Sequence, residues 1–146
     1  MVTINEIESE YSYIKSWDKT SESYHNSIDF PHQDDFCDVY FTSKNKIITQ
    51  SQVDRFNNFL IEYEKYLIEI NHYIFLNLKH QERKSLEKIS NATLIFEVIE
   101  VPQNNLKYDF VLLCSKNYKI SIGKKYIPIR AEFKDGKILS IKRTKV

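Results

Sequence analysis

Glycine and proline are scarce in this 146-residue chain, which contains two Gly and three Pro against ten Tyr and nine Phe. So few turn-forming residues disfavour sandwiches, propellers and Gly-rich phosphate loops. No run of about 20 apolar residues occurs, so no membrane-spanning helix is expected. The first residues, MVTINEIESEYSY, are acidic where a secretory peptide needs positive charge. We therefore expect a cytoplasmic protein that folds as a single domain over residues 1–146.

Motifs for catalysis are also missing, since neither G-x-S-x-G nor H-E-x-x-H occurs. Cys37 and Cys114 each lie in an apolar run, where burial raises a thiol pKa and suppresses its reactivity. In the cytosol both thiols are expected to be free. The sequence therefore predicts no enzyme activity, no catalytic residue, no cofactor and no metal ligand.

Two groups of polar residues contain side-chain types that metal sites use. The segment from His25 to Asp38 holds two His, four Asp and one Cys, but it lacks a C-x₂-C or H-x₃-H repeat. We interpret it as an exposed acidic loop. Glu69 and His72 have the E-x-x-H spacing of di-iron bundles, which need further carboxylates from facing helices. No second long helix is predicted to supply them.

The clearest predicted element is a helix over residues 49–78, TQSQVDRFNNFLIEYEKYLIEINHYIFLNL. Thr49 and Gln52 have the spacing of a capping box. Apolar residues then recur at steps of three and four and form a stripe along one face of the helix. This stripe is wider than the narrow seam of a two-stranded coiled coil. The stripe comprises Val53, Phe56, Leu60, Tyr63, Leu67, Ile70 and Ile74, widened by Phe59, Tyr66 and Tyr73. The opposite face comprises Asp54, Arg55, Asn58, Glu62, Lys65, Glu69 and His72.

Other elements are less sharply marked. Residues 3–17 are predicted as a short helix with a Thr3–Glu6 capping box, with strand as the alternative for YSYI. Residues 18–35 are predicted to be irregular, 36–43 a strand, 44–46 a turn, and 81–90 a second helical piece.

Strand patterns follow Asn91. Residues 93–101 alternate, with Leu94, Phe96 and Val98 predicted on one face. Residues 108–115 are nearly all apolar, as in a central strand, and 118–123 form a short strand. IPIRAEF and KILSIKR flank Asp135-Gly136, a strong hairpin signal. The predicted fold is α+β: an antiparallel meander of about five strands packed against one long amphipathic helix, with a short N-terminal helix.

Charge is unevenly distributed along the chain. Residues 1–114 contain eleven Lys and Arg and eighteen Asp and Glu. Residues 115–146 contain ten Lys and Arg and only two acidic residues. The basic C-terminal strands interleave Tyr118 and Tyr126 with lysines, a pattern of single-strand nucleic-acid binders. Lys on outer strands also serves to block edge-to-edge aggregation. A nucleic-acid-binding protein is therefore the alternative function, and a small uncharacterised enzyme is the second alternative.

A strand, a helix start and a Phe-Leu pair follow one another over residues 17–78. They are IDFPHQDDFCDVYF after Trp17, Ile48-Thr49-Gln50-Ser51-Gln52, and Phe59-Leu60. This order resembles small bacterial α+β domains of the toxin-immunity type, in which I-T-x-x-Q begins a long helix and a meander follows. The C-terminus is more basic than in that pattern. The resemblance implies an immunity protein, and it carries over no functional residue.

We therefore predict a non-enzymatic protein-binding domain, an immunity protein that neutralises a bacterial toxin by occluding its active site. Acidic residues would meet a basic patch on the toxin, and aromatic residues would supply the buried anchors. The predicted partner-binding residues are Asp34, Asp35 and Asp38, or Glu62 and Glu69 on the helix, with Trp17, Tyr24 and Tyr63 as anchors. The partner's identity, and whether the chain is a monomer or a homodimer, are left open.

Overall fold

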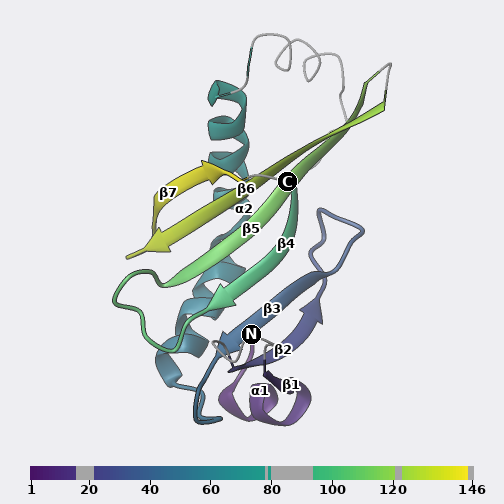
Figure 1. Cartoon of the computed structure of the whole chain (residues 1–146). Helices are drawn as coiled ribbons and strands as arrows, with labels where there is room; N and C mark the ends of the chain where they lie inside the picture. Colours follow the sequence, from purple (N-terminus) through teal and green to yellow (C-terminus); the bar gives the residue numbers. More distant parts are fainter. Residues whose placement is uncertain (16–21, 78, 80–93, 121–122, 145–146) are drawn as a thin grey trace.

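The chain forms a sheet with the long helix across one face (Figure 1). The computed structural model describes residues 1–15, 22–77, 79, 94–120 and 123–144, and for 117–120 and 123–125 the backbone alone. The elements are α1 (Ile4–Glu10), β1 (Ser12–Lys15), β2 (Glu22–Ile28), β3 (Cys37–Thr42), α2 (Gln50–Asn77), β4 (Leu94–Val101), β5 (Phe110–Ile120), β6 (Gly123–Lys134) and β7 (Lys137–Arg143).

The described strands lie side by side in sequence order, β1 to β7, in one sheet. Neighbouring strands are antiparallel except β3 and β4, which are parallel because α2 carries the chain from the end of one to the start of the other. The predicted α+β class is confirmed. The sheet has seven strands rather than about five, because β1, β2 and β3 join the C-terminal strands in a single sheet.

The start of α2 is held by Gln52, as the capping box predicts. Gln52 N donates to Thr49 Oγ1, and Gln52 Oε1 accepts from Thr49 N, both at 3.1 Å. The same amide donates through Nε2 to Thr42 O at 2.9 Å and to Val101 O at 3.0 Å. Since Thr42 and Val101 end the parallel strands β3 and β4, the side chain fixes the helix start against the sheet.

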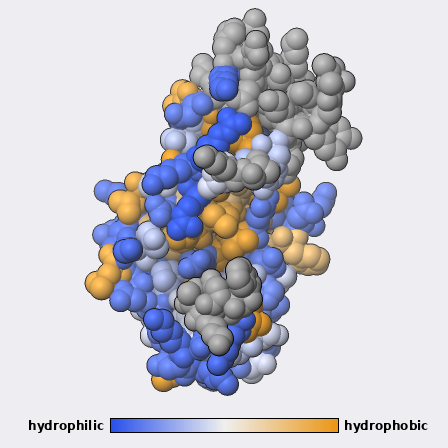
Figure 2. Space-filling model, in the orientation of Figure 1, coloured by the Kyte–Doolittle hydropathy of each residue, from blue (hydrophilic) through white to orange (hydrophobic). Residues whose placement is uncertain are grey.

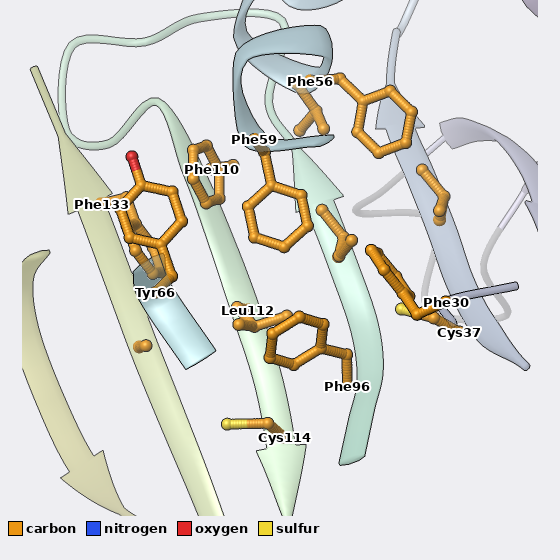
Figure 3. Packing of buried hydrophobic residues seen from close by; sticks show 14 of the residues in the cluster. Phe30, Cys37, Phe56, Phe59, Tyr66, Phe96, Phe110, Leu112, Cys114 and Phe133 are labelled. Atoms are coloured by element: carbon orange, nitrogen blue, oxygen red, sulfur yellow. The ribbon is translucent and has the colours of Figure 1, made fainter. Parts of the chain in front are cut away.

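The core is a group of aromatic rings between α2 and the strands (Figure 3). The Phe59 ring lies 5.0 Å from Phe110 and 5.8 Å from Phe96, centroid to centroid. Tyr66, two turns further along the same face of α2, lies 4.7 Å from Phe133 of β6, centroid to centroid. Burying such a side chain contributes about 1.5–3 kcal/mol. The apolar stripe of α2 is therefore the monomer's own core, as predicted.

One residue of the predicted polar face of α2 is buried instead. Arg55 is 8 % exposed, and its guanidinium donates to Asp109 O at 2.6 Å and to Pro102 O at 2.7 Å. Burial lowers the pKa of this guanidinium, partly offset by the charge of Asp109. The two carbonyls belong to the connection between β4 and β5, so Arg55 holds that loop against the helix.

The N-terminal half contains strands where the sequence predicted other structure. The helix predicted over 3–17 ends at Glu10, and the alternative prediction of a strand is confirmed for Ser12–Lys15, which form β1. The Thr3 cap on Glu6 N is confirmed at 3.2 Å. The prediction of an irregular stretch over 18–35 is wrong for Glu22–Ile28, which is β2. The polar residues of β2 form a strand because β1 and β3 pair with it on both sides.

The face alternation predicted for residues 93–101 is wrong after Phe96. A β-bulge between Phe96 and Val98 inserts one residue opposite β5. Phe96 and Ile99, three apart, are therefore both fully buried on the helix side. Val98, predicted to share the face of Phe96, lies on the other face of the sheet with Glu97.

The strand predicted over 118–123 is not separate. β5 runs on to Ile120 and pairs along its length with β6 from Gly123, so the two make one long hairpin. The Asp135-Gly136 turn is confirmed: both residues have positive φ, 53° and 73°, and β6 pairs with β7 on either side. The helical piece predicted over 81–90 lies outside the described residues.

Candidate partner-binding surface

The face of the sheet away from α2 has no helix over it among the described elements (Figure 1). Alternation along each strand decides which side chains point there. On β3 these are Asp38 and Tyr40, because Cys37, Val39 and Phe41 are buried under α2. The register then places Val98 and Glu100 of β4 beside them. Figure 2 shows hydrophobic residues at the centre of this open face, surrounded by hydrophilic ones.

One side of the open face and its adjoining loop are acidic. Asp38, Glu97 and Glu100 lie on β3 and β4, and Asp29, Asp34 and Asp35 lie in the connection before β3. We call these six carboxylates the acidic patch. Residues 22–43 and 94–101, which supply it, contain no Lys or Arg. These segments therefore supply negative charge and no Lys or Arg, a balance that would attract a basic surface.

The loop that contributes to the patch is fixed against β4 by one side chain. Gln33 Oε1 accepts from Phe96 N at 2.8 Å, and Gln33 Nε2 donates to Phe96 O at 2.9 Å and to Asp35 O at 2.8 Å. The side-chain amide thus satisfies both the N–H and the C=O of Phe96, as the backbone of a neighbouring strand would. Asp34, Asp35 and Phe36 follow it and are exposed, with Phe36 at 65 %.

Phe36 is the most exposed aromatic side chain among the described residues. It directly follows the two carboxylates Asp34 and Asp35 in the sequence. It lies immediately before β3, two residues ahead of Asp38 and four ahead of Tyr40. Tyr40 stacks on His25 at 4.6 Å between ring centroids. Alternation of Phe36 and Tyr40 opposite Cys37, Val39 and Phe41 is visible in the sequence. It would have identified these aromatic residues, which the predicted anchors omit.

Ser27, His25 and Asp38 meet on the open face, but they do not form a nucleophilic triad. Ser27 Oγ donates to Asp38 Oδ1 at 2.8 Å, and His25 Nε2 lies 3.3 Å from the same oxygen. A Ser nucleophile needs its hydroxyl on the imidazole, with the carboxylate behind it. Here the carboxylate lies between the two. The arrangement positions Asp38 rather than activating Ser27.

Glu97, placed on the open face by the bulge, has two hydroxyl partners. Ser115 Oγ donates to Glu97 Oε1, and Tyr126 Oη donates to the same oxygen at 3.0 Å. Burial raises the pKa of Tyr126, helped by the hydrogen bond to Glu97. A hollow of about 260 Å³ adjoins this group and is lined by Glu97, Leu113, Cys114, Tyr126, Pro128, Ile129 and Thr144.

A second hollow, about 390 Å³, lies where the parallel strands β3 and β4 end. Glu22, Lys44 and Glu100 are its charged lining residues. Its remaining lining residues are Thr42, Ser43, Pro102, Gln103 and Asn104. In open parallel sheets, ligands bind outside the carboxyl ends of the strands. Here β3 and β4 are the one parallel pair among the described strands of an otherwise antiparallel sheet, so that rule does not by itself indicate a ligand site. The hollow borders the acidic patch through Glu100.

The thiols and histidines do not assemble a reactive centre in the described part of the chain. Cys37 and Cys114 are free and buried, and burial raises the pKa of Cys37 to about 12, with Asp38 and Glu97 adding to the effect. Burial likewise raises the pKa of Cys114. No group of three His, Cys, Asp or Glu side chains among the described residues could hold a metal ion.

The two acidic groups predicted from the sequence lie on different surfaces. Asp34, Asp35 and Asp38 are in the acidic patch, whereas Glu62 and Glu69 are exposed on α2, behind the sheet. Tyr24, predicted as an anchor, is instead 7 % exposed in the monomer's own core, and its hydroxyl donates to Lys46 O at 2.9 Å. Trp17 lies outside the described residues.

The remaining predicted anchor and the basic strands have internal contacts. Tyr63 packs on Phe30 at 5.2 Å, so this anchor helps to close the core. On the C-terminal strands, Arg130 Nη2 lies 3.5 Å from Glu132 Oε2, and Tyr126 donates to Glu97. The side chains of Tyr118 and of Lys119, Lys124 and Lys125 lie outside the described part.

Comparison with known proteins found no matching family model, curated protein or solved structure. None of the described helices is long and apolar enough to span a membrane.

Proposed function

We propose that this chain is a non-enzymatic protein-binding domain that holds a basic protein against its acidic patch. We further propose that it acts as an immunity protein, covering the active site of a bacterial toxin. The supporting observation is the patch itself: six carboxylates from β3, β4 and the loop before β3, with no Lys or Arg in those segments. Such a field steers a basic partner and favours fast association.

An exposed aromatic side chain next to this charge supports a protein partner. Interfaces draw most of their binding free energy from a few aromatic or Arg residues, with charged groups around them. Phe36 is 65 % exposed beside Asp34 and Asp35. A partner that covers Phe36 would bury its ring and bring its own cations onto the carboxylates.

The loop geometry is suited to binding without rearrangement. Gln33 fixes the loop to β4 through two hydrogen bonds to the Phe96 backbone and makes a third to Asp35 O within the loop, and Phe30 anchors it in the core at 3 % exposure. A surface that is already ordered loses less conformational entropy when a partner binds. This favours recognition of a preformed shape over folding on binding.

The non-enzymatic part of the proposal rests on the titratable groups. The thiols are buried and protonated at neutral pH, and the Ser27–Asp38–His25 group has the wrong order of hydrogen bonds for nucleophile activation. Glu97 is engaged by two hydroxyl donors. These contacts hold side chains in place on the open face.

The test uses the purified product of the neighbouring coding sequence as the partner. Isothermal titration should give a complex that weakens as salt rises from 50 to 300 mM, because screening reduces attraction between exposed charges. The variant Asp34→Asn/Asp35→Asn/Phe36→Ser should bind at least tenfold more weakly, on the order of 1.4 kcal/mol or more. If the partner is a toxin, an equimolar amount of the wild-type chain should abolish its activity.

The matched control is Glu62→Gln/Glu69→Gln, which removes two exposed carboxylates from the other side of the molecule. This variant should keep the wild-type affinity and salt dependence. An equal loss in both variants, or a complex unaffected by salt, would contradict the proposal that the acidic patch is the binding surface.

A further inference from the structure

The hollow beside Glu97 lies on the open face, where β5 pairs Cys114 with Ile129 of β6. Both side chains are buried in the core, so these two residues close its floor. Its walls are one carboxylate, one phenol ring, two apolar side chains and one hydroxyl, from Glu97, Tyr126, Leu113, Pro128 and Thr144. At about 260 Å³ it is smaller than the pockets of about 300–1,000 Å³ that hold drug-sized ligands, so it suits a single side chain. We call it the Glu97 hollow.

The carboxylate of Glu97 is fixed at one edge of this hollow. The β-bulge between Phe96 and Val98 places Glu97 on the open face, from which its side chain reaches across β5 to β6. Ser115 Oγ and Tyr126 Oη both donate to Oε1, and Tyr126 Oη lies 3.2 Å from Oε2. A carboxylate can accept about four hydrogen bonds, so Oε2 keeps the capacity for a further donor.

The negative charge of Glu97 is not neutralised by an ion pair among the described residues, because none of their salt bridges includes it. Its charge adds to the raised pKa of Cys37 and Cys114, whose side chains are on the helix side. The field of this carboxylate therefore acts through the sheet as well as on the open face. An incoming cation would meet an attraction that no described counter-ion offsets.

One basic side chain of β6 lies on the same face but is directed elsewhere. Arg130 is paired with Leu113 in the strand register, yet it does not line the hollow. Its Nη2 lies 3.5 Å from Glu132 Oε2, and its guanidinium carbon lies 6.0 Å from the centroid of the Tyr108 ring. The described lining of the hollow thus has a carboxylate and no cation.

We propose that the Glu97 hollow receives an arginine side chain of the basic partner. This inference rests on the proposed function, because it assigns one contact to the same partner on the same face. Charge selects a cation, and the walls select Arg over Lys. A guanidinium is planar, is weakly hydrated and stacks on aromatic rings, and Tyr126 is 38 % exposed beside the carboxylate. The methylene groups of the arginine would lie against Leu113 and Pro128.

The site is ordered before a partner arrives. Two hydroxyl groups already hold the Glu97 carboxylate, so little side-chain entropy is lost when a cation binds to it. Arginine is one of the residues that most often supply a large share of the binding free energy when seated in a pocket. The hollow would therefore hold one anchor of the complex, and Phe36 would supply another at the loop before β3.

Titration of the ¹⁵N-labelled full chain with N-acetyl-arginine methylamide, at constant ionic strength, tests the inference without the partner. Amide signals of Leu113, Ile129 and Thr144 should shift, with a dissociation constant on the order of 1–20 mM for so small a compound. N-acetyl-citrulline methylamide, the uncharged isostere, should bind roughly fivefold more weakly. The lysine compound should bind roughly twofold more weakly. Equal shifts with the arginine and citrulline compounds, or tighter binding of the lysine compound, overturn the inference.

The variant Glu97→Gln tests the carboxylate itself. The amide oxygen of Gln can still accept from Ser115 and Tyr126, so the fold should be kept, while the arginine compound should bind roughly fivefold more weakly. Glu100→Gln is the matched control, because it removes another carboxylate of the acidic patch from the same strand, and it should bind as the wild type does. Unchanged binding in Glu97→Gln, or an equal loss in Glu100→Gln, overturns the inference. If Glu97→Gln does not fold, the comparison of arginine with citrulline on the wild type still decides.

Titration with the whole partner separates this inference from the proposed function. Glu97→Gln should weaken the complex roughly tenfold. Wild-type affinity in Glu97→Gln, together with a loss in Asp34→Asn/Asp35→Asn/Phe36→Ser, overturns the arginine site and leaves the proposed function standing. Binding of the arginine compound in the hollow, with no complex formed by the partner, overturns the proposed function alone.

Discussion

Gln52 makes hydrogen bonds in three directions from a fully buried position. Its side chain caps α2 through Thr49 and reaches the last carbonyls of β3 and β4. The capping box could be predicted from Thr49 and Gln52 alone, because a cap depends on spacing within one turn. The contacts to Thr42 and Val101 could not, since they depend on how the strands are placed beside the helix.

Replacement of Gln52 by Ala should lower the free energy of unfolding by about 2–4 kcal/mol, because it removes a cap and leaves two buried carbonyls without their donor. Urea denaturation followed by circular dichroism would measure the change. Gln50→Ala is the control: Gln50 is exposed and bonds only the exposed Asp54 in the described contacts, so its loss should cost less than about 0.5 kcal/mol. Equal losses would contradict the role assigned to Gln52.

His32 is a titratable group at the margin of the core. Its Nε2 donates to Leu94 O at 3.1 Å, its ring stacks on Tyr63, and its Nδ1 is buried with no described hydrogen-bond partner. Burial lowers the pKa of the imidazole, and the bond to Leu94 O offsets this only partly. The native state therefore disfavours the protonated ring, which would leave an N–H on Nδ1 without an acceptor.

Stability should consequently fall with pH below the ordinary His value of about 6.5. The unfolded chain takes up a proton on His32 in that range while the folded chain does not, so the contribution is complete above about 6.5 and is lost as pH falls towards the lowered folded pKa. Urea denaturation at pH 7.5 and 5.5 should show a smaller difference for His32→Gln than for the wild type. An unchanged difference would show that other groups cause the acid dependence.

At the scale of elements, the helix and the turn could be predicted from local sequence patterns, whereas the pairing of strands could not. Residues 50–77 form a helix because nothing interrupts the three-and-four spacing, and Asp135-Gly136 turns because both residues tolerate positive φ. β2 was missed because its polar residues lack alternation, and only pairing with both neighbours makes it a strand. The bulge at Glu97 was missed because the β4 sequence alternates regularly through it.

The β6–β7 turn gives a prediction about backbone strain. Gly136 has φ of 73°, and a Cβ built there would meet nothing within 4 Å. Gly136→Ala should therefore destabilise the protein by about 1 kcal/mol through backbone strain alone. Thermal denaturation would measure this against Lys137→Ala, one exposed residue further on, which should be close to neutral. A neutral Gly136→Ala would mean that the turn can change its conformation.

At the scale of the whole molecule, the sheet separates the two acidic groups that looked equivalent in the sequence. Asp34 and Asp35 were correctly predicted to be exposed, because PHQDD is polar and turn-rich. That Glu62 and Glu69 lie behind the sheet follows only from which face α2 covers. Tyr24 was misassigned because an isolated Tyr in a polar segment has no periodic pattern that would indicate burial.

The two sides of the molecule differ in character. The open face carries the acidic patch, and the exposed Phe36 and the loop held by Gln33 adjoin it, whereas the outward side of α2 carries Ile61 and Ile68 among charged residues. The proposed binding of a basic protein therefore belongs to the open face.

Chemical-shift mapping of the ¹⁵N-labelled chain with its unlabelled partner tests the central proposal most directly. Amide signals from Asp34 to Tyr40 and from Glu97 to Glu100 should shift or broaden on titration. Signals of residues 61–76 should stay in place. Changes confined to α2 or to β7, with the signals of the acidic patch unmoved, would contradict the account.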